Sequence, residues 1–192
     1  MAQAIQIPLQ VRFGDIDAYH HVNNVVYLQY LEDARVQLMH TQVQVQDGTT
    51  GSFDSLIGEA FFTLVGRNEI EYLAPIAFRT EPVFVNIWVT NIGGSSYDFG
   101  YSVTEADTAV VYALAATSMV LVSRATGRPV RLTEAQRAAL DIWRGDPVPF
   151  KRRPTAPNPT APNSTAPNST APNSDVDPST PKPPTPQQER IE

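Results

Sequence analysis

The stretch that decides the fold is RFGDIDAYHHVNNVVYLQYLEDAR, residues 12–35. Its first half is polar and contains a glycine, which is typical of a loop. Its second half begins a run of apolar residues at steps of four, three and four, namely Tyr27, Leu31, Ala34 and Leu38. This spacing is one face of an α-helix, and Asn23 is a favoured type of N-cap residue. The sequence therefore predicts a loop followed by a long amphipathic helix.

The residues before this stretch alternate between apolar and polar, which predicts a strand with one buried face. The apolar positions are Ile5, Ile7, Leu9, Val11 and Phe13. Pro8 lacks the N–H group that a strand donates to its neighbour, so we expect this strand at a sheet edge or at a bulge.

Four more strands are predicted after the helix, over residues 60–73, 79–92, 95–105 and 108–124. Short breaks such as Gly93-Gly94 indicate hairpins, which predicts an antiparallel meander. A final short helix is expected over residues 133–143, where Thr133 and Gln136 have the spacing of a capping box. The order of elements is α+β, with the long helix covered by an antiparallel sheet of about five strands. Element order alone leaves several topologies open.

The composition changes near residue 150. Thirteen of the 17 prolines lie after Gly145, and no aromatic residue follows Phe150. Residues 155–174 read TAPNP, TAPNS, TAPNS, TAPNS, a repeat that is too polar to build a core. We therefore expect one domain over residues 1–150 and a disordered, Pro-rich tail over residues 151–192.

Composition also excludes several classes of protein. The chain has no cysteine, which excludes disulfides, thiolate zinc sites and cysteine nucleophiles. We find neither a signal segment nor an apolar run of about 20 residues, so we expect a cytoplasmic protein that does not enter a membrane. Residues 1–150 carry nine arginines, no lysine and sixteen acidic residues, which argues against nucleic-acid binding. A site for an anionic ligand would therefore depend on local arginines.

Carboxylates and histidines gather in the loop before the helix, at Asp15, Asp17, His20 and His21. The first amides of a helix lack intrahelical acceptors, and the helix dipole adds partial positive charge there. Such an end can hold a carbonyl oxygen that becomes negative during acyl transfer, while a nearby carboxylate such as Asp17 attacks or activates water.

Three interpretations of this loop stay open at this point. The first is a polar turn braced by Asp15 and Asp17, and the second is a carboxylate hydrolase. The third is a metal site made from the two aspartates with His20 and His21, although their spacing matches no standard cluster. A serine triad is not expected, because the chain has no Gly-x-Ser-x-Gly motif.

Three motifs resemble a known family. The longest is Arg12-x-x-Asp15-x-Asp17-x-x-x-His21-Val22-Asn23-Asn24-x-x-Tyr27-x-x-Tyr30-x-Glu32-x-Ala34-Arg35, which closely resembles the 4-hydroxybenzoyl-CoA thioesterase-like branch of the hot-dog superfamily. Residues 69–75 and 115–129 resemble a further strand and the last strand of that branch. The resemblance spans roughly residues 5–142 and implies a hot-dog fold, in which an antiparallel sheet wraps a long central helix.

The resemblance implies an acyl-CoA thioesterase that releases a free carboxylic acid and coenzyme A. Asp17 matches the catalytic nucleophile or general base, and Asn24 matches the position whose backbone N–H polarises the thioester carbonyl. His21 and Asn23 belong to the same catalytic loop, where they brace it or take part in the chemistry. Coenzyme A is part of the substrate, so no cofactor and no metal are expected. The candidates for binding its phosphates are Arg67, Arg124, Arg128 and Arg131.

The chain departs from the family pattern at two positions. His20 stands where many members have glycine, and Asn24 stands where some acyl-CoA thioesterases have a helper histidine. The acyl preference is therefore open, as is the choice between nucleophile and general base.

The family also implies a homodimer or homotetramer with the active site at the subunit interface. Residues 83–89 or 97–103 are candidates for the pairing strand. Two other functions stay open on this fold. One is a hydratase or dehydratase that pairs His20 or His21 with Asp17, and the other is a non-catalytic acyl-CoA-binding or scaffold protein.

Overall fold

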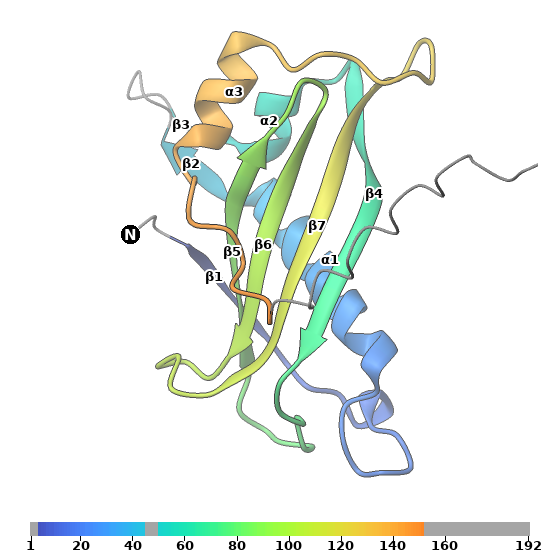
Figure 1. Ribbon diagram of the computed structural model, residues 1–192, viewed down its shortest axis with the longest axis vertical. Coiled ribbons are helices and arrows are strands. Elements are labelled where there is room, and N and C mark those ends of the chain that lie inside the picture. The colour runs from blue at the N-terminus through green and yellow to red at the C-terminus, as the bar shows by residue number, and fades with distance from the viewer. Residues whose placement is uncertain (1–3, 45–49, 152–192) are drawn as a thin grey trace, which may run out of the picture. The chain divides into compact units, whose positions relative to one another are not determined.

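The computed structural model describes residues 4–44 and 50–151. A five-stranded antiparallel sheet lies against one long helix, and two short helices lie near one end of the sheet (Figure 1). In chain order the elements are β1 (Ile5–Leu9), a 3₁₀ turn (Phe13–Asp15), α1 (Asn24–His40), β2 (Gln42–Gln44), β3 (Thr50–Ser52), α2 (Phe53–Ile57), β4 (Phe61–Tyr72), β5 (Val83–Ile92), β6 (Ser96–Thr104), β7 (Val111–Ser123) and α3 (Glu134–Asp141).

The strands of the large sheet follow the order β1-β5-β6-β7-β4. The β5–β6–β7 part is the predicted meander, but β4 pairs with β7 rather than with β5, so the prediction of a four-strand meander is wrong for β4. The loop after β4 therefore carries the chain past β7 and β6 to β5, which lies beside β1. The two edges are β1 and β4, and the edge position expected for the strand with Pro8 is confirmed.

The core lies between α1 and the sheet. The apolar face predicted for the helix is fully buried, because Tyr27, Leu31, Ala34 and Leu38 are each no more than 2% exposed. Alternate residues of β5 and β6 face it, namely Val83, Val85, Ile87, Val89, Tyr97, Phe99, Tyr101 and Val103. Burial of this apolar surface is the main force that stabilises the domain, at about 25 cal/mol per Å². A long helix wrapped by an antiparallel sheet is the hot-dog fold, as the resemblance implied.

The ends of the helices agree closely with the sequence. Asn23 caps α1, since its side chain accepts a hydrogen bond from the Val25 amide. Thr133 and Gln136 form the expected capping box at the start of α3. Both caps supply acceptors for amides that have no partner within the helix.

Three local predictions were wrong. The first strand ends at Leu9, and Phe13 lies in the 3₁₀ turn with its side chain 80% exposed. The region after α1, expected to be a loop, holds the short strands β2 and β3 and the helix α2. The suggested pairing strands, residues 83–89 and 97–103, are interior strands with neighbours on both sides.

The segment after α3 crosses the face of the sheet opposite to α1 (Figure 1). The Gly145 amide donates to the Val89 carbonyl at 2.8 Å, and the Trp88 indole N–H donates to the Asp146 carbonyl at 2.8 Å. The segment reaches β4, where the Lys151 amide donates to a carboxylate oxygen of Glu71 at 2.9 Å. The rest of the predicted tail lies outside the described residues. No described helix has the length and apolar character needed to cross a membrane.

Gly100 allows this side of the sheet to pack closely. A methyl group there would lie 2.7 Å from Trp88 and 2.7 Å from Thr90. We expect Gly100→Ala to lower the free energy of unfolding by about 1–3 kcal/mol, because those side chains must move. Urea denaturation measures the effect, with Gly94→Ala as the control, since a methyl group at Gly94 would have no neighbour within 4 Å. Equal losses in the two variants would contradict the prediction.

Candidate functional site

The loop before α1 is a tight hairpin. The Asp17 amide donates to the His21 carbonyl at 2.9 Å, and the His20 amide donates to the Asp17 carbonyl at 3.0 Å. His20 closes the turn with a φ of 65°, in the left-handed region that favours glycine. This explains why a glycine is the usual residue in the family pattern at this position. The His20 side chain is exposed.

Asp15 braces this hairpin against the helix. Its side chain is buried, with 8% of the residue exposed, and Oδ2 accepts hydrogen bonds from the Tyr30 hydroxyl at 2.6 Å and from the Arg12 amide at 2.8 Å. Its carbonyl accepts from the Asn23 amide at 2.9 Å. Burial and the hydrogen bond to Asp15 both raise the pKa of Tyr30, so the hydroxyl stays protonated as a donor. Asp15 therefore has the bracing role that was considered for it.

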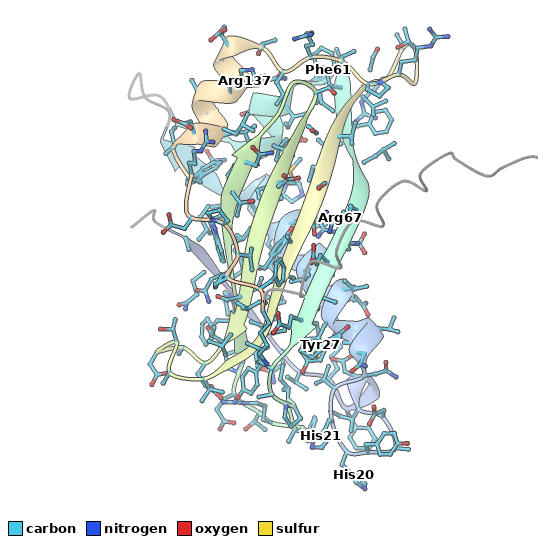
Figure 2. The ribbon with its side chains drawn as sticks, viewed as in Figure 1. His20, His21, Tyr27, Phe61, Arg67 and Arg137 are labelled. Atoms are coloured by element: carbon cyan, nitrogen blue, oxygen red, sulfur yellow. The ribbon has the colours of Figure 1, made fainter. Side chains whose placement is uncertain are left out.

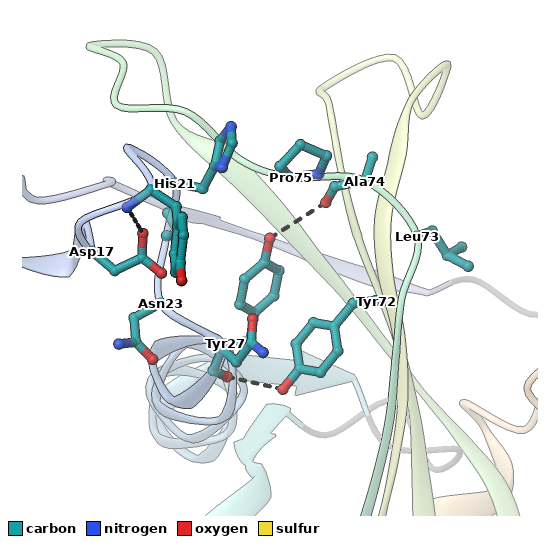
Figure 3. A pocket seen from close by; sticks show the side chains of 11 residues that line it. Asp17, His21, Asn23, Tyr27, Tyr72, Leu73, Ala74 and Pro75 are labelled. Carbon is teal, nitrogen blue, oxygen red and sulfur yellow. Dashed lines mark hydrogen bonds between the residues drawn. The ribbon is translucent and has the colours of Figure 1, made fainter.

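Asp17 instead faces a cavity. Its Oδ1 accepts a hydrogen bond from the Tyr19 amide at 2.8 Å, which fixes the carboxylate within the turn. The cavity has a volume of about 510 Å³ and lies between the hairpin, the start of α1 and the end of β4 (Figure 3). The predicted residues His21, Asn23 and Asn24 also line it, so the structure brings the four loop residues to one place.

Asn24, the first residue of α1, lines this cavity. The Val25 amide donates to the Asn23 side chain at 3.0 Å, and the Val26 amide donates to the Asn23 carbonyl at 2.9 Å. The Asn24 amide lies in the first turn of α1 and has no intrahelical acceptor. No described residue accepts from it. It lies at the positive end of the helix dipole.

The opposite wall of the cavity comes from the end of β4 and the loop behind it, at Tyr72, Leu73, Ala74 and Pro75. The Tyr72 hydroxyl donates to the Asn24 carbonyl at 2.9 Å, and the Tyr72 ring packs edge-on against Tyr27 with 5.1 Å between centroids. Tyr72 was part of a recognised motif, but sequence reasoning gave it no role. Tyr27, which we had assigned to the core, is buried and also lines the cavity.

The four candidate arginines do not lie at this cavity in the same chain. Figure 2 shows His21 and Tyr27 at one end of the sheet, Phe61 at the other end and Arg67 between them. Arg67 pairs with Glu69 on exposed β4, and Arg124 stacks on the Phe62 ring, 5.3 Å from its centroid. Phe62 and Tyr72 are ten positions apart on β4, roughly 30 Å at the usual rise of a strand. Arg128 and Arg131 follow β7 at the same end as Arg124, and both are exposed.

The metal interpretation finds no support in the geometry. The Asp15 carboxylate is turned towards Tyr30, and His20 does not line the cavity. Within residues 4–44 and 50–151, no three histidine or carboxylate groups come together as a metal site requires.

Comparison of the sequence with known protein families gives a match that covers both the sheet and the loop before α1. Residues 11–140 match the thioesterase-like superfamily, and this range includes the hairpin, α1 and the sheet from β4 to β7. The chain belongs to this superfamily. By family it is a thioester hydrolase. No curated protein matches the sequence.

Solved structures of thioesterases have the same fold. A thioesterase from Thermus thermophilus, complexed with coenzyme A and Zn, is 30% identical, with 73% of this chain and 98% of that chain aligned and a TM-score of 0.56. The probable thioesterase YbaW from Escherichia coli is 22% identical over 72% and 97% of the two chains, with a TM-score of 0.61. The 1,4-dihydroxy-2-naphthoyl-CoA thioesterase Slr0204 from Synechocystis is 19% identical over 72% and 96%, with a TM-score of 0.57.

The strained position in the hairpin gives a test of the loop geometry. We expect His20→Gly to raise the free energy of unfolding by about 0.5–1 kcal/mol, because glycine adopts positive φ without a steric penalty. The control is Ala18→Gly, at a neighbouring position where φ is not positive. There the extra freedom of the unfolded chain should lower stability. Urea midpoints measure both variants, and a destabilised His20→Gly protein would contradict the expected strain.

Proposed function

We propose that the protein hydrolyses an acyl-CoA thioester to a free carboxylic acid and coenzyme A, with Asp17 and the Asn24 amide acting on the thioester carbonyl. The observation that carries this proposal is that one cavity holds both a carboxylate and a helix N-terminus with an unpaired amide. Acyl transfer needs these two parts, a group that attacks or activates water and a donor for the developing oxyanion. Membership of the thioesterase-like superfamily supports the same reaction.

In the proposed reaction the thioester oxygen accepts a hydrogen bond from the Asn24 amide. The Asp17 carboxylate then attacks the carbonyl carbon to form a tetrahedral adduct. The C–S bond of this adduct breaks, coenzyme A leaves as its thiolate, and an acyl-aspartyl anhydride remains. Water hydrolyses the anhydride and restores the carboxylate. In the alternative, Asp17 takes a proton from water, and the hydroxide attacks the thioester directly. Both routes need the same two groups of the chain.

In this proposal Asn23 and His21 act by holding the loop in place. The Asn23 side chain accepts a hydrogen bond from the Val25 amide, so the backbone amide of Asn24 is the one left as a donor in this turn. The His21 carbonyl accepts from the Asp17 amide, and an isolated bridge joins His21 to Ala77. The hairpin is thereby held on both sides, which keeps the donor and the carboxylate preorganised.

We also propose that two copies pair through the free edge of β4. A twelve-residue edge strand with unpaired backbone groups and exposed apolar side chains, among them Leu64 and Val65, is a surface for pairing with a second chain. Pairing about a two-fold axis perpendicular to the sheet makes the strands antiparallel. The Phe61 end of one β4 then lies beside the Tyr72 end of the other, which would bring Arg124 towards the cavity of the partner.

Asp17→Asn tests the proposed reaction. We expect kcat to fall by about 10³-fold or more with KM nearly unchanged, because the amide neither attacks nor removes a proton. Released thiol is measured with short, medium, long and aromatic acyl-CoAs. The control is Asp33→Asn, a half-buried aspartate on α1 outside the cavity that pairs with Arg12 at 3.9 Å. Full activity of Asp17→Asn would eliminate this mechanism, and a wild type that binds acyl-CoA without turnover would favour a binding protein.

The pairing of β4 is tested by the mass of the protein in solution. We expect a dimer for the wild type and a shift towards monomer for the double variant Leu64→Lys/Val65→Lys, because two charges on the edge oppose strand addition. Light scattering after size exclusion measures the mass. Val110→Lys, at another exposed apolar residue, is the control and should stay dimeric. A monomeric wild type would contradict pairing through this edge.

A further inference from the structure

We propose that Tyr72 is a positioning residue for acyl transfer, because its hydroxyl holds the carbonyl of Asn24 and thereby aims the neighbouring free amide into the cavity. This inference rests on the proposed function for its chemistry. The contact itself joins two parts of the chain that are 48 residues apart, the last residue of β4 and the first residue of α1. Tyr72 acts through Asn24, and we assign it no contact with the substrate.

Hydrogen bonds fix the backbone on both sides of the Asn24 amide. Before it, the Asn23 amide donates to the Asp15 carbonyl, and the Asn23 carbonyl accepts from Val26. After it, the peptide unit between Asn24 and Val25 is held at both polar atoms, since the Val25 amide donates to the Asn23 side chain at 3.0 Å and the Asn24 carbonyl accepts from Tyr72 at 2.9 Å. Tyr72 is the member of this set that lies outside the loop and α1. Without its hydroxyl the first turn keeps its cap but loses the hydrogen bond that holds the Asn24 carbonyl to β4.

A second tyrosine makes the reverse connection. The Tyr27 hydroxyl, from α1, lies 3.5 Å from the Ala74 carbonyl, which is at the long limit of a hydrogen bond. The two rings pack edge-on between these contacts (Figure 3). Burial raises the pKa of both Tyr27 and Tyr72, so the two hydroxyls remain protonated donors at neutral pH. The helix start and the strand end are therefore joined by two hydroxyls that point in opposite directions.

The strand end that carries Tyr72 is itself held in place. The Leu73 amide donates to the Tyr112 carbonyl at 2.8 Å, and the Ala74 amide donates to the same oxygen at 3.1 Å. This double contact fixes the direction of the chain directly after Tyr72. The β4–β7 pair thus fixes the position of the Tyr72 ring, and through it the position of the Asn24 carbonyl.

The Tyr72 hydroxyl contributes little to folding. Tyr72 is 41% exposed, and a hydrogen bond at such a position largely replaces one to water, so its net contribution to stability is small. Phenylalanine would keep the packing against Tyr27. A mainly structural role therefore predicts almost no effect of Tyr72→Phe on the reaction. A positioning role predicts a loss in kcat, because catalytic hydrogen bonds depend on sub-ångström placement of the donor.

The kinetic test compares Tyr72→Phe with Tyr101→Phe. We expect Tyr72→Phe to lower kcat by about tenfold with KM changed less than about threefold. Tyr101→Phe also removes one hydroxyl, which accepts a hydrogen bond from Arg35 in the middle of the domain, and it should lose stability without losing kcat. Wild-type kcat in Tyr72→Phe, or an equal loss of kcat in the two variants, would overturn the proposal.

A second measurement does not depend on turnover. In amide hydrogen exchange followed by NMR, Tyr72→Phe should increase the exchange rate of the Val25 amide and shift the resonance of Asn24, while Tyr101→Phe should leave both unchanged. If the wild type hydrolyses no acyl-CoA, the proposed function fails, but these two amides still report whether Tyr72 holds the turn. Unchanged resonances and exchange in Tyr72→Phe would overturn the positioning role whatever the activity.

Discussion

The candidate site depends on the hydrogen bonds of the buried Asp15 carboxylate. A buried charge must be compensated by hydrogen bonds, and Asp15 obtains them from the Tyr30 hydroxyl on α1 and from the Arg12 amide before the hairpin. Its own carbonyl receives the Asn23 amide, the N-cap residue of α1. The same residue therefore fixes where the loop turns and where the helix begins. The placement of the hairpin that carries Asp17 and of the start of α1 follows from these two constraints.

The site obtains positive potential from local groups, although residues 1–150 carry nine arginines and sixteen acidic residues. The helix N-terminus supplies partial positive charge next to Asp17 without adding a cation that would pair with the carboxylate. The four arginines predicted to bind coenzyme A lie away from the cavity in the same chain, as Arg124 on Phe62 illustrates. A negative domain can thus bind an anionic substrate if donors and cations come from different elements, and from two subunits in the proposed dimer.

Local patterns in the sequence were sufficient to predict the elements that depend on neighbouring residues. The apolar face of α1, the Asn23 cap and the capping box at Thr133 follow from spacings of three or four residues. The pairing of β4 with β7 could not be predicted this way, because it joins residues about 50 positions apart. The same limit applies within the site. The sequence placed Asp15 and Asp17 together, but only the contact with Tyr30 separates the brace from the carboxylate that faces the cavity.

Strain at His20 can persist because the hairpin is fixed from outside. A left-handed conformation costs a non-glycine residue about 1–2 kcal/mol, which would favour rearrangement in a free loop. Here the residues on either side of the hairpin are held, since the Val22 amide donates to the Ile76 carbonyl at 2.8 Å and Asp15 accepts from Tyr30. A loop that is over-determined in this way can tolerate such strain. The rigidity that places Asp17 also explains how the chain carries histidine where the family pattern has glycine.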